Sequence, residues 1–476
     1  MLAAVMGTLH KEWDKPLHDL TFLVGILMLG MGVGSLIFAP TAVIYGKRLI
    51  YLCSQCILFG GLIWAANAKS FGSLLGARFM CGVGGGPAES LPSATIAELY
   101  FAHERAYRTG IYTLLLLGGK NLVPLVAGFI AEPLGWHWIF YIAAIIAGAC
   151  FLATAIFVHE TWWDRTPIPN KRSQMESENA RVAREEMHRP AFDTSMDQIA
   201  PTLTVTSRKS AENNADISSE DIHHGKRKPF AKNINIYSGR KSNDPWIRVF
   251  CRPFVLYLYP PILFSTCLYS LSVIWLSVIA ETLSTIFSAP PYSFSVTSVG
   301  LLYIGTFVGG CLGSAIAGYL SDSIVRLMAR RNNGVYEPEF RLVMVLPVAI
   351  STAIGIIGFG WSTFKEDAWI VPCIFLGFIG FGTSLGSTVS ITYAVDSYKI
   401  FAAEALVSLN LAKNILGFLF CIFVPYFLEK AGRRTSYAVY GAIQIALCLT
   451  AIPLYRYGKV LRHFRDKHNI IGKLYK

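Results

Sequence analysis

Two opposite charges lie inside one apolar run of the sequence. Arg78 and Glu89 stand in the segment Gly72–Ala97, with Gly82 and Gly86 between them at spacings of four, four and three residues. These spacings place all four residues on one face of an α-helix. The two charges are eleven residues apart, about 16 Å of helix rise, which is too far for a direct ion pair. We expect them to flank a path for protons or a small molecule; the alternative is that each forms a structural contact with a neighbouring helix.

Lys120 and Asn121 fall in the middle of another apolar segment, Arg108–Ala131. A lysine in such a segment is costly, and it either loses its proton or pairs with an acid. We expect Lys120 to recognise an anionic group or to pair with Glu89. A position tolerated on a water-exposed face is the alternative.

Three polar residues form a further stripe in the apolar segment Ala403–Leu428. Asn410, Lys413 and Asn414 follow the i, i+3, i+4 spacing of one helix face, and this stripe is predicted to line a cavity. Glu281, by contrast, lies near the outer end of its apolar segment. We interpret it as an interfacial carboxylate in water and assign it no coupling role.

The sequence shows no arrangement typical of an enzyme. Gly84-Gly85-Gly86 lies inside an apolar run without the G-K-[ST] that a phosphate-binding loop requires, so drive by ATP is not expected. The ten cysteines are scattered, and Cys53 and Cys56 lie within an apolar segment, which favours helix packing over a disulfide, redox or metal function. We therefore predict no catalytic residues, no metal and no bound cofactor.

The elements that position these residues are long apolar helices. The chain of 476 residues is 53% hydrophobic and 15% charged, and its apolar residues lie in long blocks. A hydrocarbon layer of ~30 Å needs about 20 mostly apolar residues per crossing helix. We predict an all-α integral membrane protein with eleven spans near Thr21–Ala42, Arg48–Asn67, Gly72–Ala97, Arg108–Ala131, His137–Val158, Phe254–Leu283, Phe294–Tyr319, Leu342–Trp361, Ala368–Ala394, Ala403–Leu428 and Ser436–Tyr455.

These spans divide the chain into two helical halves. Residues 1–159 hold five spans, residues 160–252 form a polar linker predicted to be largely disordered, residues 253–457 hold six spans, and residues 458–476 form a basic tail. Cations concentrate in the linker and the tail, which places both in the cytoplasm. Topology therefore explains the net charge of +12, and no nucleic-acid partner is expected. Three cations on the other side are exceptions: Lys430, Arg433 and Arg434.

The number of spans before the linker is odd, which would place Met1 outside the cell. Two halves of six spans would restore parity, and Met1–Thr8 resembles the end of a first helix. We expect the first helix to be missing because of a truncated gene model or variant. A protein with eleven spans and an external N-terminus is the alternative.

A short internal repeat links the two halves. Gly34 is followed nine positions later by Val43, and Gly313 is followed at the same offset by Asp322. Glycines allow helices to approach closely, while charges at the cytoplasmic rim can form contacts that break as the halves move. We expect a gating motif at these sites, with anchoring by the positive-inside rule as the alternative for Arg48. The motif also includes Gly46, Lys47 and Arg48 in the first half and Arg326 in the second.

Three of these segments resemble motifs of the major facilitator superfamily. The run from Gly34 to Arg48, ending Y-G-K-R, is similar to its loop 2–3 motif, with Val43 in the acidic position that Asp322 keeps in the second half. The segment Arg78-Phe-Met-Cys-Gly82 resembles the R-x-x-Q-G motif, whose arginine the family associates with proton coupling. The third segment, Gly119–Gly128, is similar to the antiporter motif G-P-x-x-G-P-x-x-G-G, and it contains Gly119, Pro124 and Gly128.

Elements of the second half resemble a narrower group. Arg331–Glu339, Tyr393–Tyr398 and Ala403–Ala405 are similar to the fungal drug:proton antiporter-like group, within it the branch of the yeast low-specificity cation and polyamine permease. The resemblance implies two pseudo-repeated six-helix halves, alternating access and a binding site between the halves near the membrane midplane.

Together these features predict a proton-coupled secondary transporter that exports small organic molecules. Uptake of polyamines or other cations is one alternative, and a non-transporting sensor or an inactive truncated paralogue is another. The expected partners are a small-molecule substrate, protons and the lipid bilayer. We expect a monomer in the plasma membrane, with the vacuolar membrane as the alternative.

Overall fold

The computed structural model describes residues 5–99, 102–161, 239–240, 245–332, 336–398 and 402–468. The greater part of the predicted linker, residues 162–238, lies outside the described residues. The elements are α1 (Met6–Trp13), α2 (Leu17–Tyr45), α3 (Lys47–Ala66), α4 (Phe71–Leu99), α5 (Ala102–Leu134), α6 (Trp136–Phe157), α10 (Trp246–Leu256), α11 (Pro260–Ser288), α12 (Val296–Arg331), η2 (Pro338–Met344), α13 (Val345–Lys365), α14 (Ile370–Ser397), α15 (Ala402–Leu449) and α16 (Ala451–His468).

The predicted spans coincide with helices, with small differences at their boundaries. Among the described residues, eight helical segments are long and apolar enough to cross a membrane, and one of these, Glu404–Arg462, contains two passes. The two passes are separated at Gly432, where φ is 74° inside α15. Helices α4 and α5, with 29 and 33 residues, complete the bundle. The predicted all-α membrane fold is confirmed.

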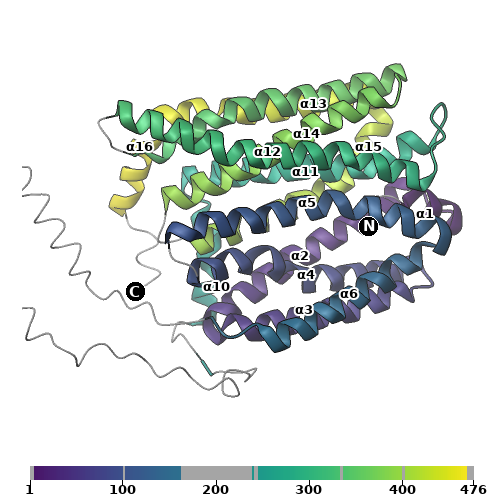
Figure 1. Ribbon diagram of the computed structural model, residues 1–476, viewed down its shortest axis with the longest axis horizontal. Coiled ribbons are helices and arrows are strands. Elements are labelled where there is room, and N and C mark those ends of the chain that lie inside the picture. Colours follow the sequence, from purple (N-terminus) through teal and green to yellow (C-terminus); the bar gives the residue numbers. More distant parts are fainter. Residues whose placement is uncertain are drawn as a thin grey trace, which may run out of the picture. The chain divides into compact units, whose positions relative to one another are not determined.

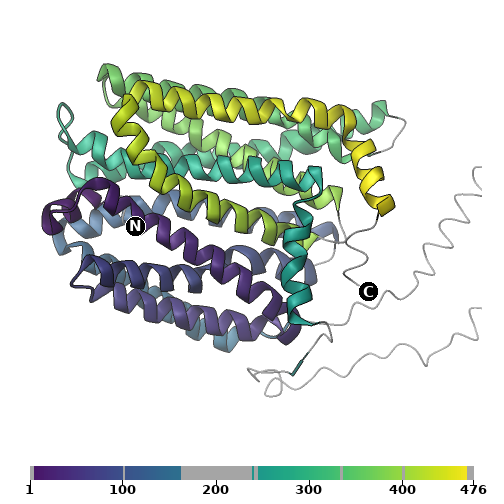
Figure 2. The same cartoon turned by 180° about the vertical axis from the view of Figure 1, so that it is seen from behind.

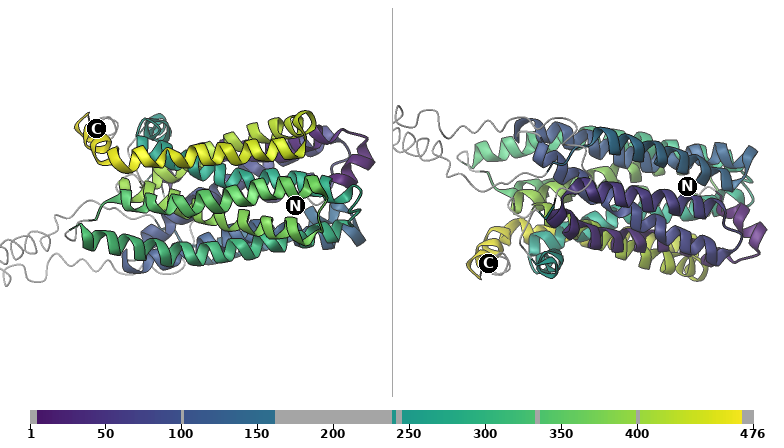
Figure 3. Two further views of the ribbon diagram at one scale, coloured as in Figure 1. Left: turned by 90° about the horizontal axis from the view of Figure 1, so that it is seen from above. Right: turned by 90° about the horizontal axis from the view of Figure 1, so that it is seen from below.

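The helices form two groups that lie along a common direction, as Figures 1 and 3 show. In the first half, α2 packs on α4, α3 packs on α4, and α6 packs on α3; in the second half, α12 and α13 both pack on α14. The halves meet where α2 contacts α15 and where α5 contacts α12. We call the end of the bundle where α6, α12 and α14 finish the linker end. Each half is thus a compact group of helices, joined to the other along two seams.

Glycines set the distance between the paired helices in both halves. A Cβ on Gly34 of α2 would lie 2.3 Å from the carbonyl oxygen of Val83 in α4, and a Cβ on Gly313 of α12 would lie 2.6 Å from that of Phe381 in α14. Gly82 of α4 packs equally closely against α2. Small residues permit such close crossings in membrane helices. The repeated glycines therefore serve the same packing function in each half.

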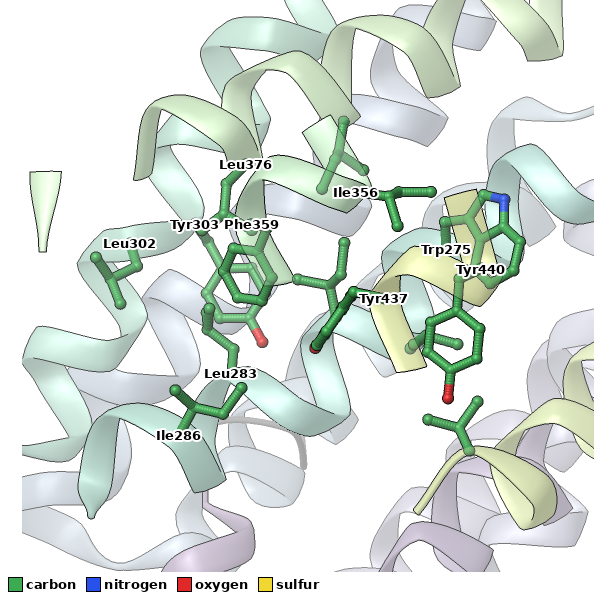
Figure 4. Packing of buried hydrophobic residues seen from close by; sticks show 14 of the residues in the cluster. Trp275, Leu283, Ile286, Leu302, Tyr303, Ile356, Phe359, Leu376, Tyr437 and Tyr440 are labelled. Carbon is green, nitrogen blue, oxygen red and sulfur yellow. The ribbon is translucent and has the colours of Figure 1, made fainter. Parts of the chain in front are cut away.

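Aromatic side chains form much of the core of the second half, and the polar tips of Trp275 and Tyr437 are hydrogen-bonded (Figure 4). The rings of Trp275 and Tyr440 stack with centroids 5.4 Å apart, and the indole N–H of Trp275 donates to Gln444 Oε1 at 2.9 Å. The hydroxyls of Thr282 and Tyr437 lie 2.6 Å apart. Buried Trp and Tyr need such partners. These contacts join α11 to the last helical pass of α15.

The last residues of the predicted linker form helix α10, which crosses the linker end of the bundle (Figure 2). Trp246 and Phe250 stack with centroids 5.0 Å apart, and the indole of Trp246 donates to Thr41 Oγ1 of α2 at 3.2 Å. Helix α10 also packs against α15. It therefore contacts both halves, whereas the sequence predicted a linker as far as Arg252. Helix α16 likewise extends into the predicted tail.

Candidate functional site

A cavity of about 250 Å³ lies between the two halves. Residues of α2, α4 and α5 line it from the first half, and residues of α11, α12, α14 and α15 line it from the second. Most of its wall is apolar, but four of the described acidic or basic side chains line it: Arg78, Glu89, Glu281 and Lys413. An apolar cavity with a few converging polar groups is the usual form of a small-molecule site.

Glu89 and Lys413 form a buried ion pair that joins the halves. Lys413 Nζ lies 2.5 Å from Glu89 Oε2, and the two side chains are 5% and 4% exposed. The amide of Asn410 donates to the carbonyl of Glu89 at 3.3 Å and accepts from the hydroxyl of Tyr269 at 3.3 Å. The ammonium also lies 5.9 Å from the centre of the Tyr269 ring. The predicted stripe on α15 therefore faces the predicted stripe on α4.

Tyr112 of α5 stabilises the helix at the position of Glu89. Pro92 has no N–H and cannot close the helical hydrogen bond to the carbonyl of Ala88. The Tyr112 hydroxyl lies 3.1 Å from that carbonyl oxygen and 3.2 Å from that of Glu89, so it can donate to both. Side chains of neighbouring helices often satisfy carbonyls freed by proline in membrane helices. Tyr112 and Tyr269 were not predicted from the sequence, although Pro92, three residues after Glu89, indicates that a donor is needed there.

Arg78 is buried on the same helix, with 5% of its surface exposed. Its guanidinium lies 5.7 Å from the centre of the Phe140 ring, and its Nε has no hydrogen-bond acceptor. Among the described residues no carboxylate lies within ion-pair distance of it. Both Arg78 and Glu89 line the cavity, while Gly82 and Gly86 of the same predicted face pack against α2.

Of the other predicted site residues, some line the cavity and others do not. The side chains of Lys120 and Asn121 lie outside the described residues, although their backbone belongs to α5. Asn414 is buried and lines the cavity, as does Pro124. Gly128 packs at the seam between the halves, where its Cβ would lie 3.1 Å from the carbonyl oxygen of Val296 in α12. Gly119 makes no close contact.

In the first half, the residues predicted to form a gating motif contact Glu160, which was not predicted from the sequence. The carboxylate of Glu160 accepts from the backbone N–H groups of Lys47 at 3.2 Å and of Arg48 at 3.3 Å. Arg48 also donates from Nη2 to the carbonyl of Ala155 at 2.9 Å. Gly46 has φ 95°, and a Cβ there would lie 2.3 Å from Glu160 Oε2. Glu160 thus supplies a carboxylate at the N-terminus of α3, a favourable place for an anion.

In the second half, the main ion pair differs from the predicted one. Arg326 donates to the backbone carbonyl of Asp322 at 3.2 Å, and the Asp322 side chain is 68% exposed, 3.8 Å from Arg341 Nη1. The close pair is Arg341 with Asp396, which also accepts from the Tyr336 hydroxyl at 2.5 Å. Burial, aided by Asp396, raises the pKa of Tyr336 to about 12. Asp396 belongs to a segment noted only for its family resemblance.

The burial of Glu281 differs from the prediction made from the sequence. It is 1% exposed, so the prediction of an interfacial carboxylate in water is wrong. Helix α11 continues beyond the predicted span to Ser288, and neighbouring helices cover the side chain. The signal was present in the sequence, because an ionisable residue inside an apolar helix faces the protein interior as a rule.

Comparisons with known proteins agree with this architecture. The family model described as Major Facilitator Superfamily matches residues 1–421. The chain is similar to Protein HOL1 of Saccharomyces cerevisiae (26% identical, covering 96% of this chain and 83% of that protein) and to Efflux pump radE of Floropilus chiversii (25% identical, covering 93% and 73%). Its fold is similar to that of the proton:xylose symporter XylE, with a TM-score of 0.61 at 15% identity over 96% of this chain and 91% of that one.

The match over most of its length shows that the chain belongs to the major facilitator superfamily. It is a multi-pass membrane protein and a secondary transporter, not an enzyme. The predicted family and transporter class are confirmed. The cavity between the halves lies where alternating-access carriers of this design bind their substrates.

Proposed function

We propose that this carrier couples the export of small organic molecules to the entry of protons. The observation that carries the proposal is the buried Glu89–Lys413 pair in the cavity between the halves. A proton on Glu89, or a charged group of a substrate, competes with the pair. Because the pair joins α4 to α15, such competition weakens a contact that holds the halves together.

The relatives support the direction of transport. Some similar proteins are described as efflux pumps, among them radE of Floropilus chiversii and FUB11 of Gibberella fujikuroi. The distribution of cations favours a linker end that faces the cytoplasm. Arg78 is the proposed coupling residue on α4. We place the carrier in the plasma membrane as a monomer.

Uptake of a cationic amine is a second candidate. Glu281 lines the cavity, and in its ionised form it would favour a positively charged substrate, whereas Glu89 is already paired with Lys413. The direction of flux separates this candidate from export.

Flux through purified protein in liposomes tests the proposal. Rhodamine 6G, tetraphenylphosphonium and radiolabelled spermidine serve as probes, with protein-free liposomes and an added protonophore as controls. We expect a pH gradient to drive accumulation of at least one probe and the protonophore to abolish it. Binding of a probe without gradient-driven flux would instead indicate a sensor.

A further inference from the structure

Glu281 is the second buried carboxylate of the cavity and has no role in the site described above. Its Oε1 accepts a hydrogen bond from the thiol of Cys421 on α15, with Sγ and Oε1 2.8 Å apart. Its Oε2 is buried and has no hydrogen-bond partner among the described residues. The side chain lines the same cavity as Arg78 and the Glu89–Lys413 pair. An unpartnered carboxyl oxygen thus lies in the wall of a cavity.

The neighbours of Glu281 supply no cation in contact with it. Within the described part of the chain, no basic nitrogen lies within ion-pair distance of its carboxylate. The hydroxyl of Tyr303 on α12 donates to the carbonyl of Ala280 at 3.0 Å. Figure 4 shows Tyr303 among apolar side chains of the second half. Among the described side chains, Tyr303 and Arg78 are thus the titratable or charged groups that line this part of the cavity beside Glu281, and Cys421 contacts Glu281 directly.

Most of the other described acidic and basic side chains on the helices that pack against α11 have contacts elsewhere or lie at the linker end. At the opposite end of the bundle, in α15, Lys430 lies over the Tyr426 ring, Arg433 donates to the carbonyl of Thr363 and Arg434 lies over the Trp361 ring. Helix α1 packs against α11, and there the ring of His10 contacts the carbonyl of Lys15, while Glu12 accepts from the indole of Trp136. The hydroxyl of Tyr437 of α15 forms a hydrogen bond with the hydroxyl of Thr282. In α12, α14 and α16 the described acids and bases lie at the linker end: Asp322, Arg326, Arg330, Arg331, Asp396, Arg456, Lys459 and Arg462.

The position of Glu281 along the bundle separates it from the ion pair. Arg78 lies seven residues after α4 begins at Phe71, and Glu281 lies seven residues before α11 ends at Ser288. Both residues are therefore in one layer near the end opposite the linker. Glu89 lies about 16 Å further along α4, since each residue adds 1.5 Å. Among the described side chains the cavity thus has two charged layers, and the deeper one is internally paired.

We propose that Glu281 binds and releases the coupling proton, an assignment that rests on the proton coupling proposed above. An ionised carboxylate without a cation inside a helical bundle is costly, and protonation removes that cost. The neutral acid therefore suits the arrangement described here. Release transfers the proton to water that enters the cavity and leaves a carboxylate. Arg78 is the cation in the same layer that can stabilise it, because Lys413 is paired with Glu89.

Infrared spectroscopy tests the titration of Glu281 without any substrate. Full-length protein in liposomes is compared between neutral and alkaline pH, where exposed carboxyl groups are already ionised, and the carbonyl stretch of a protonated carboxylic acid is followed. We expect a band that disappears at alkaline pH in the native protein and is absent from Glu281→Gln. Glu429→Gln, the same change at an exposed position near the end of the first pass of α15, should keep the band. A band that persists in Glu281→Gln, or no titrating band in the native protein, would overturn the proposal.

Transport by Glu281→Gln provides an independent test. With a probe that the native protein moves, we expect loss of gradient-driven accumulation but retention of exchange of that probe across the membrane without a pH gradient. Retention of gradient-driven accumulation would overturn the proposal, as would loss of exchange in folded protein, which would mark Glu281 as a substrate contact. If the native protein moves no probe, the proposed function fails, and the infrared result still decides whether Glu281 titrates.

Discussion

Lys413→Met is expected to destabilise the protein by removing one partner of its buried ion pair. The change leaves the Glu89 carboxylate with a side chain that is 4% exposed. Removing one member of a buried pair costs about 3–5 kcal/mol, because the remaining charge is neither solvated nor paired. Asn410 does not offset this loss, since its amide donates to the backbone carbonyl of Glu89. We therefore expect the free energy of unfolding to fall by about 3–5 kcal/mol.

A double-mutant cycle separates the ion pair from other effects. Glu89→Gln, Lys413→Met and the double variant are unfolded by sodium dodecyl sulfate in dodecylmaltoside micelles, with helix content followed by circular dichroism. The double variant removes both charges, so it should lose less stability than the sum of the single changes, by about 1–3 kcal/mol. Lys69→Met, at an exposed lysine between α3 and α4, should change stability by less than about 0.5 kcal/mol.

Small or additive effects would refute this reasoning. Exposed ion pairs contribute about 0.2–1 kcal/mol, because water screens both charges. If both single variants fell within that range, the cavity would be hydrated at Glu89 and the pair would not hold the halves together. Additivity in the double variant would show that the two side chains do not interact in the folded protein.

Further predictions concern backbone geometry and the linker end. Gly46→Ala should cost about 1–3 kcal/mol, because φ is 95° there, whereas Gly60→Ala, a helical position with open space around it, should not destabilise; thermal unfolding compares the two. Gly34→Ala should cost about 1–3 kcal/mol, since its Cβ would lie 2.3 Å from a carbonyl oxygen of α4, and detergent unfolding measures the loss. Arg341→Met should cost about 3 kcal/mol by leaving Asp396, 19% exposed, without its arginine; Asp396→Asn in the same background should restore part of it, and no restoration would contradict the pairing.

The class of fold follows from the amino-acid sequence alone. Apolar blocks of about 20 residues predict helices that cross a bilayer. A helix forms hydrogen bonds between its own backbone groups, which have no water to bond to inside the hydrocarbon layer. Periodicity also placed Asn410, Lys413 and Asn414 on one face, and they lie at the cavity or beside it. Such predictions succeed because they depend on local geometry. Helix ends were less certain, as the extension of α11 to Ser288 shows.

Which charges form pairs depends on how the helices pack, and the sequence did not predict it. Glu89 and Lys413 are 324 residues apart in the chain and pair because α4 faces α15 across the seam between the halves. Glu160 supplies a carboxylate at the start of α3, close to Val43, which occupies the acidic position of the motif. Glu281 is buried, although the sequence predicted that it is exposed to water. The energy of a charge depends on the water and the partners around it, and both are set by helices distant in the chain. Residue type and spacing determine which side chains can do chemistry, and packing determines the partner that each one has.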